Sequence, residues 1–381
     1  PRMTRPPLAR SAVIAVAAIA GCGLAVSAIA QSAGVSLRAN LSERIDIEEG
    51  DAISNTGFVL NASSATRRAS LDAGAGFNLI AQTADGDYDL VNPNLSLGYR
   101  LTGKRTTLRT GARLQVQPVE YTDVDDNLNL VDRDGLRQTT SGEIGLSYQA
   151  REGTQFTADL SATDTRFDDA SPALVPSQLI TLSLGATQDL SRRVSAGVTL
   201  SFSDFDADGG DNTASESYRA TANLRFEATP NTTLSFTAGG ARTETERDDG
   251  STRGSETDDT LLFGASLDYT ANSTTSLSAS VNQNISPNSQ GALRLNTVGR
   301  LGLTYAFNAD NNVSFDVSAS RRENLNESGA ETEAVQFGAT YNRQLDRLTA
   351  LQLGYTARQA TDEDLQHRFR FSINRSVVLK P

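Results

Sequence analysis

The chain has 381 residues, of which only 38% are hydrophobic and 6% aromatic, and its formal net charge is −12. Such a composition offers little material for a large packed core, which argues against a compact soluble globule. The acidic balance disfavours nucleic acid as a partner. A Ser/Thr/Asp-rich acidic chain could also be disordered, but the regular alternation described below argues against disorder of the whole chain.

Residues 1–30 have the layout of a secretory signal peptide. Arg2, Arg5 and Arg10 precede an apolar run, Ala12–Ala30, which ends in an A-x-A cleavage pattern. The chain turns polar at Gln31, where we expect the mature protein to begin. These arginines are the only charged residues of the first thirty, so cleavage leaves 31 basic residues against 46 acidic ones, a net charge of −15.

Two other interpretations of this N-terminal segment stay open. It could be a transmembrane anchor, although it is rich in Ala and Gly and no basic stop-transfer cluster follows it. The motif Ile19–Cys22 also resembles the lipobox of bacterial lipoproteins, although the chain stays apolar as far as Ala30. Cys22 is the only cysteine, so cleavage after Ala30 would leave a mature chain without disulfide, zinc-thiolate or thiol chemistry.

Alternation between apolar and polar residues begins in the segment Val35–Ile47 and recurs through the rest of the chain. One face of this segment carries Val35, Leu37, Ala39 and Leu41, and the other carries Arg38, Asn40 and Ser42. A period of two is the signature of a β-strand with one apolar and one polar face. No later segment approaches the length of an apolar membrane helix, so any membrane association must come through strands.

The clearest example is the segment Tyr218–Gly239, with the sequence YRATANLRFEATPNTTLSFTAG. Two alternating runs flank a tight turn at Pro230-Asn231, which predicts a β-hairpin. Its apolar face is thin, and its polar face carries full charges such as Arg219, Arg225 and Glu227 that a packed soluble core would not accept. The hairpin therefore suits a wall with lipid on one side and water on the other.

Two kinds of connection join the alternating segments, and they follow each other strictly in turn. The short turns are Gly103-Lys104, Arg151-Glu152-Gly153, Asp189-Leu190-Ser191, Pro230-Asn231, Asn272-Ser273, Asn308–Asn311 and Asp346-Arg347. The long polar connections include Thr122–Arg137, Phe167–Ser177, Asp204–Glu216, Glu244–Asp259, Ser286–Ala292 and Glu323–Glu333. Short turns on one side and long loops on the other are typical of an up-and-down outer-membrane barrel, with its turns in the periplasm.

We therefore predict an all-β fold, a transmembrane antiparallel barrel over residues 31–381 behind a signal peptide over residues 1–30. Counting segments gives about eighteen strands, an even number that returns both termini to the periplasm. The number of strands depends on how two stretches are assigned, and a different assignment would change it by two. Alternation shifts its parity near Pro93, and the apolar face is weak over Asn55–Arg68.

Aromatic residues supply a second test, because membrane barrels hold them in girdles at the two interfaces. Nine of them sit within a few residues of a short turn: Tyr99, Tyr148, Phe156, Phe226, Phe236, Tyr269, Tyr305, Phe307 and Phe315. A general preference of aromatic residues for strands would not explain this clustering. The pattern predicts one ring of aromatic side chains at the periplasmic interface.

The chain also resembles a known class of proteins. The signal sequence, the PNT-type turn within Tyr218–Gly239, its echo TLLFGASLDYTANSTTSLSASV and the closing FRFSIN are similar to outer-membrane β-barrel porin families of Gram-negative bacteria. The resemblance covers most of the mature chain. It implies a barrel in the outer membrane, in contact with lipid and lipopolysaccharide and inserted by the barrel assembly machinery.

One departure from this class concerns the C-terminus. Such barrels usually end on an aromatic residue that the assembly machinery reads, whereas FRFSIN is followed here by Arg375, Val377 and Leu379 and then by Lys380-Pro381. Either the assembly signal is imperfect, or the last strand ends before these residues.

Catalysis and metal binding find little support in the sequence. The only histidine, His367, shares parity with Phe369 and Phe371, which places it on the lipid-facing side near the outer rim. We expect no enzyme activity, no cofactor and no metal site. The segment Asp204–Gly209 fits the opening of a calcium loop, D-x-D-x-D-G, but the twelfth position is Ser215 rather than Glu. A solvated acidic loop is the alternative.

Arginines on the polar parity of the strands are more informative. They are Arg100, Arg109, Arg113, Arg219, Arg225, Arg294, Arg300, Arg368 and Arg370. The expected register places Arg109, Arg113, Arg300 and Arg370 nearest to the middle of the barrel, as pore-lining residues. Guanidinium groups there could recognise phosphate, sulfate or carboxylate. They could equally pair with lumen carboxylates such as Asp159, Glu227 and Asp316 and brace the wall.

The sequence thus predicts a porin-like channel for passive diffusion of small polar or anionic solutes, because barrels of sixteen to eighteen strands leave an aqueous pore. The alternative is a non-conducting structural or surface-interaction barrel. Its acidic loops would bind cations, lipopolysaccharide or an exopolysaccharide.

Overall fold

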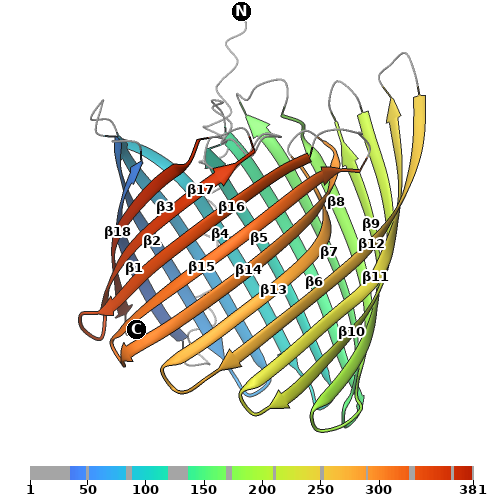
Figure 1. Cartoon of the computed structure of the whole chain (residues 1–381), viewed down its shortest axis with the longest axis horizontal. Helices are drawn as coiled ribbons and strands as arrows, with labels where there is room; N and C mark the ends of the chain where they lie inside the picture. Colours follow the sequence, from blue (N-terminus) through green and yellow to red (C-terminus); the bar gives the residue numbers. More distant parts are fainter. Residues whose placement is uncertain are drawn as a thin grey trace, which may run out of the picture.

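A single closed antiparallel β-sheet makes up the fold of this chain (Figure 1). The computed structural model describes residues 35–48, 51–82, 88–118, 136–168, 174–208, 212–248, 253–288, 291–325, 331–361 and 364–379. The predicted signal peptide lies outside these residues. No helix of the described part is long and apolar enough to cross a membrane.

Eighteen strands follow one another along the chain. The first nine are β1 (Val35–Glu48), β2 (Asp51–Ala65), β3 (Ala69–Gln82), β4 (Tyr88–Thr102), β5 (Thr106–Pro118), β6 (Leu136–Arg151), β7 (Thr154–Asp168), β8 (Ser177–Asp189) and β9 (Val194–Ala207). The others are β10 (Asn212–Thr229), β11 (Thr232–Asp248), β12 (Arg253–Thr270), β13 (Thr275–Pro287), β14 (Leu293–Asn308), β15 (Asn311–Asn324), β16 (Glu331–Gln344), β17 (Thr349–Ala360) and β18 (Gln366–Leu379).

Each strand pairs with its sequence neighbours, and β1 closes the barrel by pairing with β18 as well as β2. The closing register runs from Leu37 opposite Leu379 to Glu48 opposite Arg368. The predicted strand number and up-and-down order are therefore confirmed. Because the strand number is even, β1 begins and β18 finishes at the end of the barrel that carries the short turns.

The strands present opposite chemistry on their two faces, as their alternation predicts. Leu41, Ile144, Val198, Leu200 and Leu301 are each about half exposed on the outward face, where a membrane barrel meets lipid. All nine aromatic residues expected near the short turns are also exposed, from 37% for Tyr99 to 58% for Phe307. An aromatic girdle at this end of the barrel follows from their position.

A bulge in β4 accounts for the change of parity that the sequence shows near Pro93. The pairing of β3 with β4 shifts register between Gly76 and Asn78, and Asn92 takes a left-handed backbone conformation with φ of 55°. An extra residue in one strand switches the faces that follow it, and Asn tolerates this conformation better than most residues.

The expected lengths of the polar connections were wrong in several places. Asp204–Glu216 was expected as a loop, but β9 continues to Ala207 and β10 begins at Asn212. Glu244–Asp259 likewise belongs mostly to β11 and β12, which are connected only by residues 249–252. Strands that extend beyond the apolar belt are wet on both faces, so they keep their backbone pairing while losing their hydrophobic alternation.

The last strand extends beyond FRFSIN, which decides between the two interpretations of the C-terminal sequence. β18 continues through Arg375 and Val377 to Leu379, and it stays paired with β1 over this length. The alternative that the strand ends before these residues is therefore wrong.

One part of the wall departs from a simple cylinder. β12 pairs with β13 only from Gly264 opposite Asn282 to Thr270 opposite Ser276, whereas its other neighbour, β11, pairs with it along its whole length. In Figure 1, β12 and β13 lie side by side near the short turns and diverge toward the other end.

The diverging ends overlap rather than leave an open slit. Leu293 and Leu295 of β14 lie on the same strand face as the outward Leu301, yet they are only 4% and 8% exposed. They pack with Phe205 and Ala207 of β9 and with Ala241 of β11 and Leu262 of β12. These partners lie on the inward faces of their strands, opposite exposed residues such as Leu200 and Leu261.

We call this arrangement the overlap: the outer ends of β13 and β14 lie inside the wall formed by β9–β12. Its contacts hold most of the fully buried apolar side chains among the described residues. Gly291, with φ of 80°, passes close to Ala207 and Val175 there, where any side chain would be strained. A small hydrophobic core therefore sits in the wall at the end opposite the short turns.

Candidate functional site: the polar lumen wall

The four arginines predicted to line the pore all lie on the inward face. Strand pairing shows this, because residues directly opposite each other in a sheet share a face. Arg109 and Arg113 alternate with the outward Leu108 and Ala112, and Arg300 precedes the exposed Leu301. Arg370 lies between Phe369 and Phe371, both exposed outward. Their role in a conducting pore stays a prediction.

Arg109 braces the wall. Its Nη2 lies 2.5 Å from Oδ1 of Asp159, on β7, and β6 contributes Gly145 between them. A Cβ at Gly145 would collide with both side chains, so glycine is what allows the pair to lie flat across β6. This arginine matches the bracing interpretation, and the partner is the aspartate named for it.

Arg113 and Arg300 have a different environment. Arg113 is in register between Ser96 of β4 and Ser141 of β6, and Arg300 lies between serines of β13 and β15. Neither arginine has an ion pair or side-chain hydrogen bond to another described residue. Their neighbours are too small to cover them, so both guanidinium groups are available to a solute.

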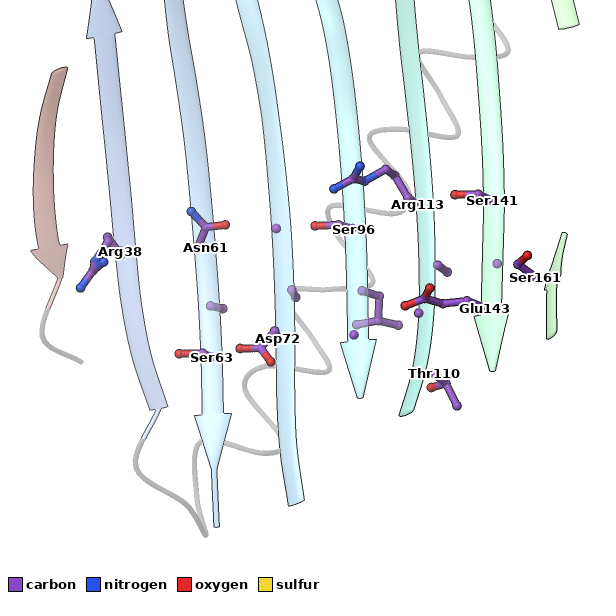
Figure 2. A pocket seen from close by; sticks show the side chains of 18 of the residues that line it. Arg38, Asn61, Ser63, Asp72, Ser96, Thr110, Arg113, Ser141, Glu143 and Ser161 are labelled. Carbon is purple, nitrogen blue, oxygen red and sulfur yellow. The ribbon is translucent and has the colours of Figure 1, made fainter. Parts of the chain in front are cut away.

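A cavity of about 880 Å³ lies against the inner wall over β1–β7 (Figure 2). Its charged lining residues are of both signs: Arg38, Asp72, Arg113 and Glu143. Serine hydroxyls and the amide of Asn61 lie between them. Figure 2 shows these side chains spread over successive strands rather than gathered at one point. Such a surface offers a series of weak polar contacts.

The remaining arginines of the polar parity also face inward. Arg225 on β10 lies 3.8 Å from Glu227, the second carboxylate proposed to brace the wall. Arg294 is only 7% exposed, and its Nε donates to Asn324 Oδ1 at 2.8 Å. Bracing and available arginines are thus mixed along the wall.

The first four residues of the acidic segment that resembled a calcium loop, Asp204–Ala207, belong to β9, and Gly209 lies outside the described residues. Asp204 and Asp206 point outward, while Phe205 between them is 1% exposed and points into the overlap. The D-x-D spacing here reflects the period of a strand, because carboxylates at i and i+2 share one face. A calcium loop needs these carboxylates to converge around a turn, which a paired strand prevents.

His367 is placed outward, as its parity predicted. Its ring stacks on Tyr355 with centroids 6.0 Å apart, and the tyrosine hydroxyl lies 2.8 Å from Nδ1. Phe369 packs on the same tyrosine. The imidazole therefore belongs to the outward surface at the start of β18 and not to the lumen.

Several residues of the site were not singled out from the sequence. Arg38, Asp72 and Glu143 line the cavity, yet only their parity was visible in the alternation. Parity tells which face a residue occupies, but its height in a tilted barrel depends on the register of all the strands. The sequence signal that came nearest to identifying these three residues is that each occupies a polar position in a strongly alternating segment.

Comparisons with known proteins identify the fold alone. No family model matches the chain, and no curated protein matches it by sequence. The Pseudomonas aeruginosa protein OpdK, solved with vanillate, has a TM-score of 0.53 and 11% identity, over 91% of this chain and 99% of that one. P. aeruginosa OccK2 (OpdF), in complex with glucuronate, gives 0.50 and 12%, over 92% and 99%.

A third solved structure widens the comparison. The unliganded ferric citrate transporter FecA has a TM-score of 0.55 and 9% identity, over 86% of this chain but only 60% of its own. The shared feature is the large transmembrane β-barrel. Together with the outward apolar face and the aromatic girdle, it assigns this chain to the outer-membrane barrel architecture.

Proposed function

We propose that this protein is an outer-membrane channel through which small polar solutes diffuse passively, with a preference for anions. The observation that supports it most is the inward face, which outside the overlap is mostly polar and carries Arg113 and Arg300 without carboxylate partners among the described residues. Barrels of this strand number are wide enough to leave an aqueous pore. Transport rather than catalysis suits a wall of dispersed charges, with its one histidine facing outward.

Small carboxylates are the solute class that we favour. A guanidinium group presents paired donors that match a carboxylate, a phosphate or a sulfate. The two Pseudomonas structures named above were solved with vanillate and with glucuronate, both of which carry a carboxylate. The cavity over β1–β7, at about 880 Å³, has room for a molecule of that size together with water.

The proposed partners follow from the surface. The outward apolar belt would contact outer-membrane lipid and lipopolysaccharide, and insertion would use the barrel assembly machinery. The acidic residues that extend above this belt on β9–β12 would face the external medium.

Liposome swelling tests the proposal. Proteoliposomes of the refolded barrel are diluted into isotonic solutions of glucuronate, of glucose and of a cationic amino sugar. We expect all three to enter, with glucuronate the fastest for its size. Matched liposomes without protein provide the baseline, and swelling no faster than that baseline would contradict the channel.

A non-conducting surface barrel is the second candidate, and the overlap is the observation that favours it. The overlap brings the outer ends of β13 and β14 inside the wall, where they occupy space that a pore would need. The same swelling experiment separates the candidates, since a properly inserted barrel of the second kind would admit none of the solutes.

A further inference from the structure

A second cavity lies between the two layers of the overlap, away from the lumen wall described above. It measures about 120 Å³ and is enclosed by the inward faces of β8–β10 and by the outer ends of β13 and β14. Ile285 and Leu293 of the inner layer supply an apolar side. The wall opposite supplies Phe205 and, beside it, the hydroxyls of Ser215 and Ser217, which are only 2% and 5% exposed.

Arg219 of β10 contributes the one charged side chain to this cavity. Its Nε is buried and has no hydrogen-bond partner among the described residues, nor does the side chain form an ion pair with any of them. Arg225, on the same face of the same strand, lies beside Glu227. Arg219 is half-buried, with its Nε shielded from water and no counter-charge beside it, which is costly for a guanidinium group, and intramembrane cations of this kind commonly mark functional sites.

The serines beside Arg219 retain capacity for a ligand. Ser215 Oγ shares one hydrogen bond with Thr245 Oγ1 at 3.0 Å, and Ser217 Oγ accepts one from Thr243 Oγ1 at 3.2 Å. A hydroxyl has one donor and two acceptor sites, so each can make a further bond. The cavity thus combines a cation and hydroxyls of the wall with the apolar side chains of Phe205, Ile285 and Leu293, which matches a ligand that is anionic at one end and apolar at the other.

The volume limits the size of that ligand. An apolar cavity of about 150 Å³ accommodates benzene, so one of 120 Å³ holds a molecule of roughly half a dozen heavy atoms. We propose that the cavity between β10 and β14 binds a short-chain carboxylate, with its carboxylate on Arg219 and its alkyl chain against Phe205 and Leu293. The bound molecule would bridge the two layers of the overlap.

Ligand-observed NMR on the refolded full-length barrel in detergent micelles tests this site, with sodium butyrate as the probe. We expect saturable binding to the wild-type protein, and about tenfold or greater weakening by Arg219→Met, which keeps much of the side-chain volume but removes the charge and its donors. Arg225→Met is the matched control and should bind as the wild type does. Arg219→Lys keeps the charge, so it should lose less affinity than Arg219→Met.

Chain length provides an independent readout. Affinity should rise from acetate to butyrate and stop rising by hexanoate, because the cavity is then full. A steady rise through octanoate would indicate partition into the micelle and overturn the proposal. So would equal binding by wild type and Arg219→Met, or inorganic phosphate binding as tightly as butyrate. The site does not depend on conduction: a barrel that binds butyrate but fails to swell liposomes would refute only the channel.

Discussion

At the scale of single residues, the arginines of the lumen differ in what lies beside them. Arg109 is neutralised by Asp159 across Gly145, whereas Arg113 and Arg300 stand between serines. Alternation in the sequence places all of them on one face but cannot show which will be paired. That distinction depends on the residue two strands away, which only the register of the sheet determines.

Asp159→Asn should separate bracing from selectivity. The pair is 54% and 36% exposed, so its loss should destabilise the barrel by less than about 1 kcal/mol. Arg109 would then be left without a counter-charge, and the pore should shift toward chloride. Arg109→Gln removes the positive partner of the same pair and leaves Asp159 charged, so it should shift the ion preference of the pore toward potassium. Reversal potentials measure both, and shifts of the same sign would show that this pair does not act on permeating ions.

A second prediction concerns the turn between β16 and β17. Asp346 Oδ1 accepts from the backbone amides of Leu348 at 2.7 Å and Thr349 at 2.9 Å. These bonds, that from Leu348 foremost, hold the pKa of the Asp346 carboxyl below its ordinary value. A carboxylate with a lowered folded-state pKa stabilises the fold above its unfolded pKa of about 4 and loses this effect as the pH falls through the folded pKa.

Asp346→Ala should therefore lower the thermal midpoint at pH 7, and its difference from wild type should shrink as the pH is lowered below about 4. Asn272 in the turn after β12 offers a neutral control, since its Oδ1 accepts from the amides at the same two offsets, at 2.8 and 2.9 Å. Asn272→Ala should lower the midpoint by an amount independent of pH. An effect of Asp346→Ala on the thermal midpoint that does not depend on pH would contradict the lowered pKa of the Asp346 carboxyl.

At the scale of elements, the overlap is the feature that alternation could not reveal. Strand number and order could be predicted, because period and turn spacing are local signals, and the parity shift near Pro93 marked the place of the bulge without revealing it. The divergence of β12 from β13 is not local. Leu293 and Leu295 have the parity of lipid-facing residues, and only the curvature of the whole sheet buries them.

Leu295→Ala tests the overlap against a control on the same strand face. Leu295 is 8% exposed and packs with Ala241 and Leu262, while Leu301 is 49% exposed. Removing the buried side chain should cost about 2–4 kcal/mol in urea unfolding of the refolded barrel. Leu301→Ala should cost clearly less, because its side chain faces lipid or detergent. Equal losses would mean that the overlap does not form in the membrane.

At the scale of the whole molecule, the net charge and the arginines of the lumen suggest opposite ion preferences. The acidic total suggests a preference for cations, but much of it lies beyond the apolar belt, where screening acts over about 8 Å at physiological salt. Inside the wall, the field of Arg113 and Arg300 is focused by low-dielectric surroundings. We therefore expect the inner arginines to outweigh the outer carboxylates.

Single-channel recording in a planar lipid bilayer under a KCl gradient measures the central claim directly. We expect discrete conductance steps, with a reversal potential shifted from zero toward the equilibrium potential of chloride. Arg113→Ala combined with Arg300→Ala should move that potential toward potassium without abolishing the steps. A barrel that inserts but passes no current would contradict the channel, and a wild-type pore that already favours potassium would contradict the role given to these two arginines.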